Sequence, residues 1–277
     1  MDPILCATTD LPPHTHALDT RQWRAQLGGA VGLGGGWQLQ LQLPVERRVI
    51  DVEYATLDGR AYAPPYRDIH HRDEVVAGLA DGSLRLGHLH RGAGPLIAVD
   101  GGMTIPLGGT QPDPFALAAA GRWHQHNQLG VGAPLVLGGA GLLWAAKPWG
   151  GAVQGGLRAP IVENGEGYRA PLTLNLGAGP SRRLWTGAVG MSAVELLREG
   201  PERWSGAQHG GRTAVQLSLA LDQALGPHLS AQVDLRAPLW QHDDAHSHGQ
   251  GAADEGSLRV GPLVGVGLAW TGAAPGR

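Results

Sequence analysis

Apolar and polar residues alternate along most of the chain. In WQLQLQL (residues 37–43), Trp37 and three leucines fall on one face, and three glutamines fall on the other. The same period of two runs through TAVQLSLALDQ (213–223) and LSAQVDLRAPL (229–239). Such a period is typical of β-strands with one apolar and one polar face. It predicts eleven strands, at 21–34, 36–50, 83–93, 95–107, 125–143, 149–162, 168–179, 184–198, 211–224, 227–241 and 257–270.

The connections between these strands alternate between short and long. Tight turns are expected at 34–36, 92–94, 145–148, 180–183 and 225–226, and long loops at 51–82, 108–124, 199–210 and 242–256. Helical spacing is weak throughout, and only DPFALAAAG (113–121) predicts one or two helical turns, inside a loop. Short turns at one end and long loops at the other are typical of up-and-down barrels of the outer membrane.

The tryptophans sort with the same two ends. Five of them fall at the short-turn end of their strands and four at or near the long-loop end: Trp37, Trp144, Trp149, Trp185 and Trp270, against Trp23, Trp123, Trp204 and Trp240. Two bands of indoles, one at each interface, are a feature of membrane-spanning barrels. Tryptophans that only fill a soluble core would not sort by end. The predicted fold is therefore all-β, an antiparallel up-and-down transmembrane β-barrel in the outer membrane of a Gram-negative bacterium.

Composition removes several other classes of protein. The net charge of the 277 residues is −3, which gives no basic field for nucleic acid. A single cysteine, Cys6, excludes an internal disulfide and a cysteine-based zinc cluster. No apolar run reaches about 18 residues, so no transmembrane helix is expected. The start, MDPILCATTD, lacks the basic and apolar regions of a signal peptide.

The barrel is expected to span residues 21–270. Residues 1–20 are expected to form an extended or poorly ordered segment, and 271–277 a C-terminal tail in which no strand is expected. Bacterial single-chain barrels have an even number of strands, so about twelve are expected where eleven are visible. The twelfth comes either from residues 1–20 or from a natural N-terminus that lies before Met1. Trp270 takes the place of the terminal aromatic residue of such barrels.

The polar faces of the strands predict the lining of the barrel. Side chains of both charges lie there, and we take Asp100, Arg158, Asp234 and Arg236 as the candidates that select a solute. The other expected lumen residues are Gln38, Gln40, Gln42, Arg85, Gln154, Asn175, Gln216, Asp222, Gln232 and Arg259. A barrel of about twelve strands lies between filled eight-stranded barrels and open porins. The charges could therefore line a narrow polar pore, or pair with one another and plug it.

Histidines gather on the long-loop side. WHQHNQ (123–128) places His124 and His126 on one face of a strand, and HDDAHSH (242–248) offers three imidazoles and two carboxylates. Imidazole with carboxylate suits zinc or copper. The predicted metal ligands are His242, His246, His248 and Asp243, with His124 and His126 from a neighbouring loop. The alternative is a solvated loop that binds no metal.

Three stretches carry a resemblance to a known family: GGMTIPLGGTQPDPFALAAAGRWHQHNQLGVGAP (101–134), LRAPIVENGEGYRAP (157–171) and LRAPLWQ (235–241). They resemble the bacterial outer-membrane transporter-like barrels of the MetA-pathway of phenol degradation type, from about residue 20 onward. The resemblance implies a barrel that takes up a small, aromatic compound, and it brings no catalytic residues.

The expected function is a passive channel or uptake protein for small molecules. Its partners would be outer-membrane lipid and a small-molecule solute. Two alternatives stay open, a surface barrel that captures transition metals and a structural barrel that docks other envelope proteins. An enzyme is not expected, because Ser192, Ser218 and Ser230 lie in strands without a nucleophile motif around them.

Overall fold

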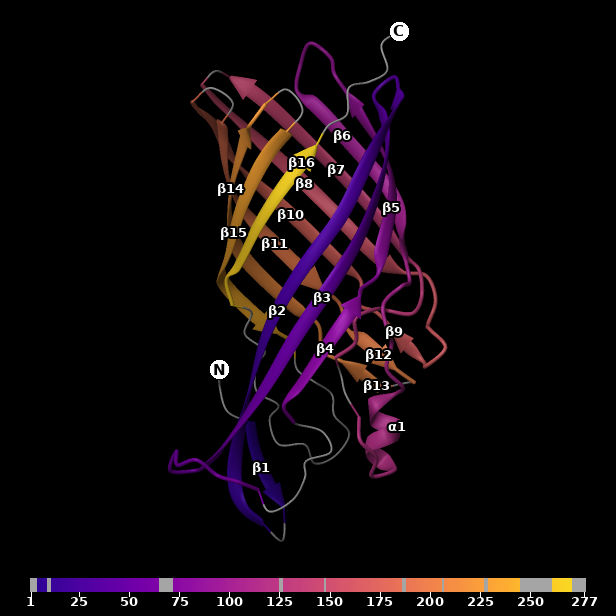
Figure 1. Cartoon of the computed structure of the whole chain (residues 1–277), viewed down its shortest axis with the longest axis vertical. Coiled ribbons are helices and arrows are strands. Elements are labelled where there is room, and N and C mark those ends of the chain that lie inside the picture. Colours follow the sequence, from indigo (N-terminus) through magenta and orange to yellow (C-terminus); the bar gives the residue numbers. More distant parts are fainter. Residues whose placement is uncertain are drawn as a thin grey trace.

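One large antiparallel sheet curls into a barrel (Figure 1). The computed structural model describes residues 4–8, 11–64, 72–124, 127–146, 148–185, 188–205, 207–226, 229–244 and 261–270. The sheet contains β1 (Ile4–Thr8), β2 (Leu11–Gly34), β3 (Trp37–Thr56), β4 (Glu74–Leu79), β5 (Gly82–His90), β6 (Leu96–Ile105), β7 (Leu135–Ala146), β8 (Trp149–Pro160), β10 (Thr173–Trp185), β11 (Ala188–Glu199), β14 (Arg212–Ala224), β15 (Leu229–Asp243) and β16 (Leu263–Trp270). The predicted fold class is confirmed. No helix in the described ranges is long and apolar enough to cross a membrane.

The eleven predicted strands correspond to the eleven long strands of the sheet, with several shifted boundaries. The long loop expected at 51–82 is partly wrong, because β3 continues to Thr56 and β4 lies within that range. β2 begins at Leu11, so residues 11–20, expected outside the barrel, extend its first long strand. β10 runs through 180–183, where a turn was expected, and ends at Trp185. β7 begins at Leu135 rather than at residue 125. The short helix expected in the 108–124 loop is confirmed as α1 (Pro114–Ala119), where the Asp113 side chain accepts hydrogen bonds from the first amides.

The order of strands leaves a seam between β2 and β16. From β2 to β16 the path takes ten antiparallel steps, so these two strands run in the same direction. Among the described residues, no pairing joins their edges, and β1 pairs only with the first residues of β2, as far as His16. Side chains beside the seam are among the most exposed apolar groups, with Leu27 75% and Val266 80% exposed. The twelfth strand that parity predicts stays a prediction, and these two edges are the ones with which it would pair.

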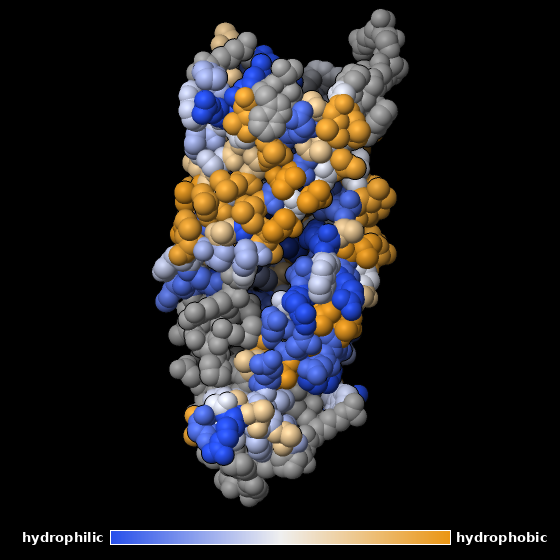
Figure 2. Space-filling view, turned by 60° about the vertical axis from the view of Figure 1, so that its left-hand side comes forward, coloured by the Kyte–Doolittle hydropathy of each residue, from blue (hydrophilic) through white to orange (hydrophobic). Residues whose placement is uncertain are grey.

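The outer face carries an apolar belt (Figure 2). Trp37 marks its edge at the short-turn end, and Trp23, with the Arg47 guanidinium 5.3 Å from its ring centre, marks the other edge. Trp37 and Arg47 are ten residues apart on β3, or about 33 Å along the strand and roughly 25 Å along the axis of a barrel tilted by about 40°. This height matches the apolar band of a membrane-spanning barrel.

The predicted tryptophan bands are confirmed for six of the residues and wrong for one. Those exposed at the two ends are Trp37, Trp144, Trp149, Trp23, Trp123 and Trp240. Trp204 is only 2% exposed and belongs to a buried cluster, not to the long-loop band. The side chains of Trp185 and Trp270 lie outside the description.

A small core lies at the long-loop end, beside α1 and a three-stranded sheet of β9 (Tyr168–Arg169), β12 (Glu202–Trp204) and β13 (Ala207–His209). Its buried residues come from separate segments: Val131, Ala133, Leu135, Tyr168, Ala170 and Trp204. We call this cluster the loop core. It joins three connections that are far apart in the sequence, and so it shapes the long-loop end of the barrel.

Candidate functional site

The strand register shows which side chains share the inner face. Directly paired residues point to the same side of a sheet. Arg236 pairs with Ser218 and Asp234 with Ala220, whereas Leu235 pairs with Leu219 on the outer, apolar face. The same pattern holds on the other side of the barrel, where Asp100 pairs with Gly139 and Arg158 with Thr173.

All four selectivity candidates therefore lie on the face opposite the apolar belt. The other expected lumen residues lie there too, except Arg259, which is outside the described residues. Their role in selecting a solute is a prediction that this geometry does not test.

The inner face is open to water. Gln154 and Arg158 on β8 are exposed, and so are their outward neighbours Val153 and Leu157. On β15, the inward Arg236 is likewise exposed. In a barrel filled by its own side chains, the inward residues would be buried. Exposure on both faces of the same strands means that the lumen is hollow at this level.

A recess indents the inner wall where β5, β6, β7, β8 and β10 lie side by side. Its volume is about 490 Å3. We call it the wall recess, and its polar side chains are Arg85, Asp100, Gln154, Arg158, Thr173 and Asn175.

Two paired glycines form the floor of the wall recess. Gly139 and Gly156 are direct partners, the Asp100 carboxylate lies over Gly139, and the Asn175 amide lies over Gly156. A Cβ at either glycine would collide with the side chain above it. The glycines therefore allow these two polar groups to lie flat against the wall.

The charges of the wall recess do not cancel. Arg85 donates to Asp100 in an ion pair between neighbouring strands. Arg158 has no ion-pair or hydrogen-bond partner within the described part of the chain, although its charge acts on the nearby Tyr168, whose hydroxyl donates to Glu202. With two arginines and one aspartate, the recess keeps one unpaired positive charge.

The opposite wall is acidic. Gln216 Nε2 donates to Glu195 Oε2 at 2.6 Å, and Asp222 is exposed on the same inner face. Asp234 lies over Gly265 of β16, with Arg236 two residues further along β15. Since β15 lies four strands along the sheet from β8, the four candidates form two separate groups. Asp100 and Arg158 lie at the wall recess, and Asp234 and Arg236 lie apart from it.

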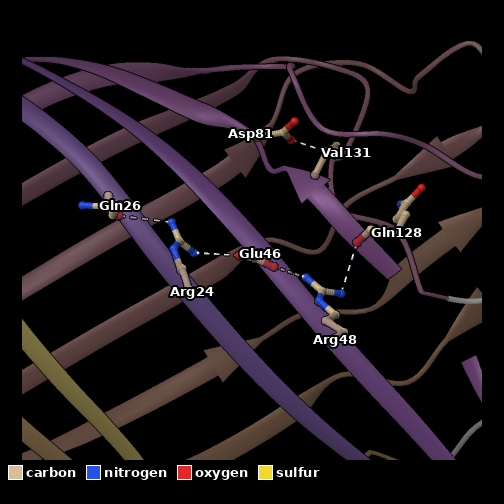
Figure 3. A network of polar contacts seen from close by, with 7 residues as sticks. All are labelled: Arg24, Gln26, Glu46, Arg48, Asp81, Gln128 and Val131. Carbon is tan, nitrogen blue, oxygen red and sulfur yellow. Dashed lines mark hydrogen bonds and ion pairs between the residues drawn. The ribbon is translucent and has the colours of Figure 1, made fainter. Parts of the chain in front are cut away.

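At the long-loop end, residues 127–134 cross the inner face of β3 and β4 (Figure 3). We call them the mouth segment. Arg48 of β3 donates from Nη1 to the Gln128 carbonyl at 3.1 Å and from Nη2 to Glu46 at 2.7 Å. Glu46 is only 4% exposed and also accepts from Arg24 at 3.2 Å. Two guanidinium groups thus satisfy one buried carboxylate, and one of them also holds the mouth segment.

Asp81 is the second anchor of the mouth segment. Its Oδ2 accepts from the Val131 amide at 2.7 Å, and its Oδ1 accepts from the Gly108 amide at 3.0 Å. On the other side, Asn164 Nδ2 donates to the Val131 carbonyl at 2.8 Å. Gly130 packs so closely on Gly108 that a Cβ at either position would collide with the backbone of the other. One carboxylate in the turn between β4 and β5 therefore joins the two ends of the connection between β6 and β7, at the entrance of the lumen.

The loop core rests on a buried tyrosine. The Tyr168 ring lies 4.6 Å from the Trp204 ring, centre to centre, and its hydroxyl donates to Glu202 at 2.9 Å. Burial, and then the neighbouring charge of Glu202, raise the pKa of Tyr168 well above its ordinary value. The tyrosine is therefore a neutral hydrogen-bond donor at any physiological pH.

The predicted metal site falls largely outside the described residues, which exclude His126, His246 and His248. His124 is 6% exposed, with Nδ1 3.0 Å from the Arg122 carbonyl oxygen. His242 stacks on Trp240 with ring centres 6.0 Å apart, next to Asp243, the last residue of β15.

Where side chains are described, no three metal-binding groups come together. Metal capture stays a prediction. Calorimetric titration of zinc into the protein should show weak binding that is lost in a triple His→Ala variant of the 242–248 loop. Identical isotherms for the two proteins would refute metal capture by this loop.

Comparisons with known proteins agree with this fold. No family model matches the chain, and no curated protein matches it either. Among solved structures, it is similar to an outer-membrane channel from Pseudomonas putida F1, with a TM-score of 0.57 and 11% identity over 92% of this chain and 82% of that one. The likeness is one of fold. It confirms the predicted all-β barrel fold, and the apolar belt fits the predicted place of this barrel in an outer membrane.

Proposed function

We propose that the protein is a passive channel through which small molecules cross the outer membrane. The observation that carries this proposal is the hollow lumen, since inward polar groups such as Arg158 and Arg236 are exposed although they face away from the apolar belt. Water can occupy such a passage, and a solute can then diffuse through it. The similar solved structure is that of an outer-membrane channel, which supports the same role.

The proposed path has a narrow and a wide part. At the long-loop end, which we take to face the medium, the mouth segment crosses the inner wall and limits access. Further in, the path passes between the wall recess and the acidic wall of β11, β14 and β15. A solute that fits would meet Arg158 on one side and Asp222 or Asp234 on the other.

The finer proposal concerns the solute. The resemblance of 101–134 and 157–171 to transporter-like barrels of the MetA-pathway of phenol degradation type supports uptake of a small aromatic compound. The wall recess has the size for such a molecule, at about 490 Å3, and Leu137, Leu143 and Met191 supply an apolar part of its lining. Pockets for small molecules commonly begin at about 300 Å3.

Flux into liposomes tests the channel directly. Purified protein in liposomes should admit small neutral solutes such as arabinose faster than empty liposomes do, and the rate should fall as the solute grows. Swelling rates equal to those of empty liposomes for every solute would refute the proposal. A second series with phenol-sized neutral aromatic compounds would test the finer assignment, which predicts faster entry than for sugars of equal size.

A further inference from the structure

We propose that the wall recess is a binding site for small organic monocarboxylates and that Arg158 is the group that binds their carboxylate. This inference rests on the proposed channel function and narrows its solutes to compounds that carry one carboxylate, on a ring or on a short chain. It starts from a difference between the two arginines of the recess. Arg85 is engaged by Asp100, whereas Arg158 has no ion-pair or hydrogen-bond partner in the described ranges. A guanidinium group that faces a water-filled recess is therefore available to a ligand.

The groups around Arg158 fit a carboxylate. A guanidinium group presents parallel N–H donors that match the two oxygens of a carboxylate. Thr173 lies directly across from Arg158 on β10, and Asn175, two residues on, lines the same recess. Both side chains can donate a hydrogen bond to a carboxylate oxygen. The acidic group of the recess, Asp100, is occupied by Arg85 and so competes little for Arg158.

The charge count favours one negative charge on the ligand. The recess carries one unpaired cation, so a dianion or a polyphosphate would leave charge without a partner. The opposite wall carries Glu195, Asp222 and Asp234 against Arg236, which repels anions from that side. A small anion in the lumen is therefore directed toward Arg158.

The remaining lining fits an apolar body. Leu137, Leu143 and Met191 line the recess with Ala98 and Ala152. A carboxylate held at Arg158 can place a short hydrocarbon chain or ring along these side chains. Hexanoate combines one charge with such a body and is a suitable probe, and hexanamide has the same shape without the charge.

Binding and conduction are measured separately, so that the two proposals can fail independently. Calorimetric titration of hexanoate into the detergent-solubilised protein should give saturable binding, about tenfold weaker for Arg158→Gln and for the neutral probe hexanamide, because the charge-assisted hydrogen bonds are lost. Arg182→Gln is the matched control. It removes an arginine on the outer face, where the guanidinium lies 4.8 Å from the Trp149 ring centre, and should bind hexanoate like the wild type.

Hexanoate binding that is absent, or equal in the wild type and Arg158→Gln, overturns the monocarboxylate site even if the protein conducts. In a planar bilayer, millimolar hexanoate should reduce the chloride current of the wild type and of Arg182→Gln, but much less that of Arg158→Gln. A wild type that binds hexanoate and carries no current keeps the site and overturns the channel.

Discussion

Arginine substitutions on the two faces of β14 should distinguish the face that contacts lipid from the face that lines the lumen. Leu219 lies in the middle of this strand on the outer face and pairs with Ser192 and Leu235. Gln216, three residues earlier, lies on the inner face, where its amide donates to Glu195. Leu219→Arg puts a guanidinium into the apolar belt near mid-membrane. Gln216→Arg puts the same group into the water-filled lumen and keeps a donor for Glu195.

The expected difference in stability follows from depth and face. An arginine on the lipid face costs about 2–4 kcal/mol at the midplane and about 0–1 kcal/mol near an interface. Leu219 is five residues from the end of β14 at Ala224 and seven from its start at Arg212, which puts it near the midplane. We therefore expect Leu219→Arg to lower the free energy of unfolding by about 2–4 kcal/mol. Gln216→Arg should change it by less than about 1 kcal/mol, as for a partly exposed ion pair.

The assay is reversible folding into phosphocholine vesicles, followed by tryptophan fluorescence across a denaturant series. A lower transition midpoint for Leu219→Arg alone would support the register. If Gln216→Arg were the destabilised variant and Leu219→Arg were neutral, the strand would be shifted by one residue and every face assignment would reverse.

Two further predictions concern the long-loop end. Asp81→Ala removes the acceptor of two backbone amides, those of Gly108 and Val131, so the mouth segment should exchange its amide hydrogens faster in deuterium-exchange mass spectrometry; unchanged exchange there would refute the anchor. The raised pKa of Tyr168 means that the folded state favours the protonated hydroxyl. The stability that this preference adds is fully present below the ordinary tyrosine pKa of about 10 and is lost as pH rises above that value. Tyr168→Phe should remove this alkaline loss in pH-dependent unfolding of the loop core, together with the hydrogen bond to Glu202, and a loss of equal size in both proteins would contradict the assignment.

The strand faces could be predicted from the sequence because each depends on local alternation. Once Leu219 and Leu235 are placed on lipid, Gln216, Asp234 and Arg236 must face inward. This local rule also put Asp100 and Arg158 on the inner face. It could not show that these two share a recess, because that depends on which strands are neighbours.

The mouth segment was missed for a physical reason. The alternation in 125–134 resembles a strand, but Gly132 has a φ of 72°, a left-handed conformation that interrupts the extended backbone of a regular strand. The anchors Asp81 and Arg48 are about 50 and 80 residues away in sequence. Trp204 was misplaced in the same way, since its burial comes from Tyr168 and Val131 on other loops. No local signal indicates such contacts.

Single-channel current through the purified protein in a planar bilayer tests the central claim most directly. Two glycines of β7 provide the matched variants. Gly141 is on the inner face, where an added Cβ would make only ordinary contacts, the nearest at 3.5 Å, and Gly138 is on the outer face, where the nearest atom to an added Cβ is 4.0 Å away. The account predicts discrete conductance for the wild type, a smaller one for Gly141→Trp, whose indole would project into the lumen, and an unchanged one for Gly138→Leu. No conductance in the wild type, or an equal loss in both variants, would contradict a solute path through this lumen.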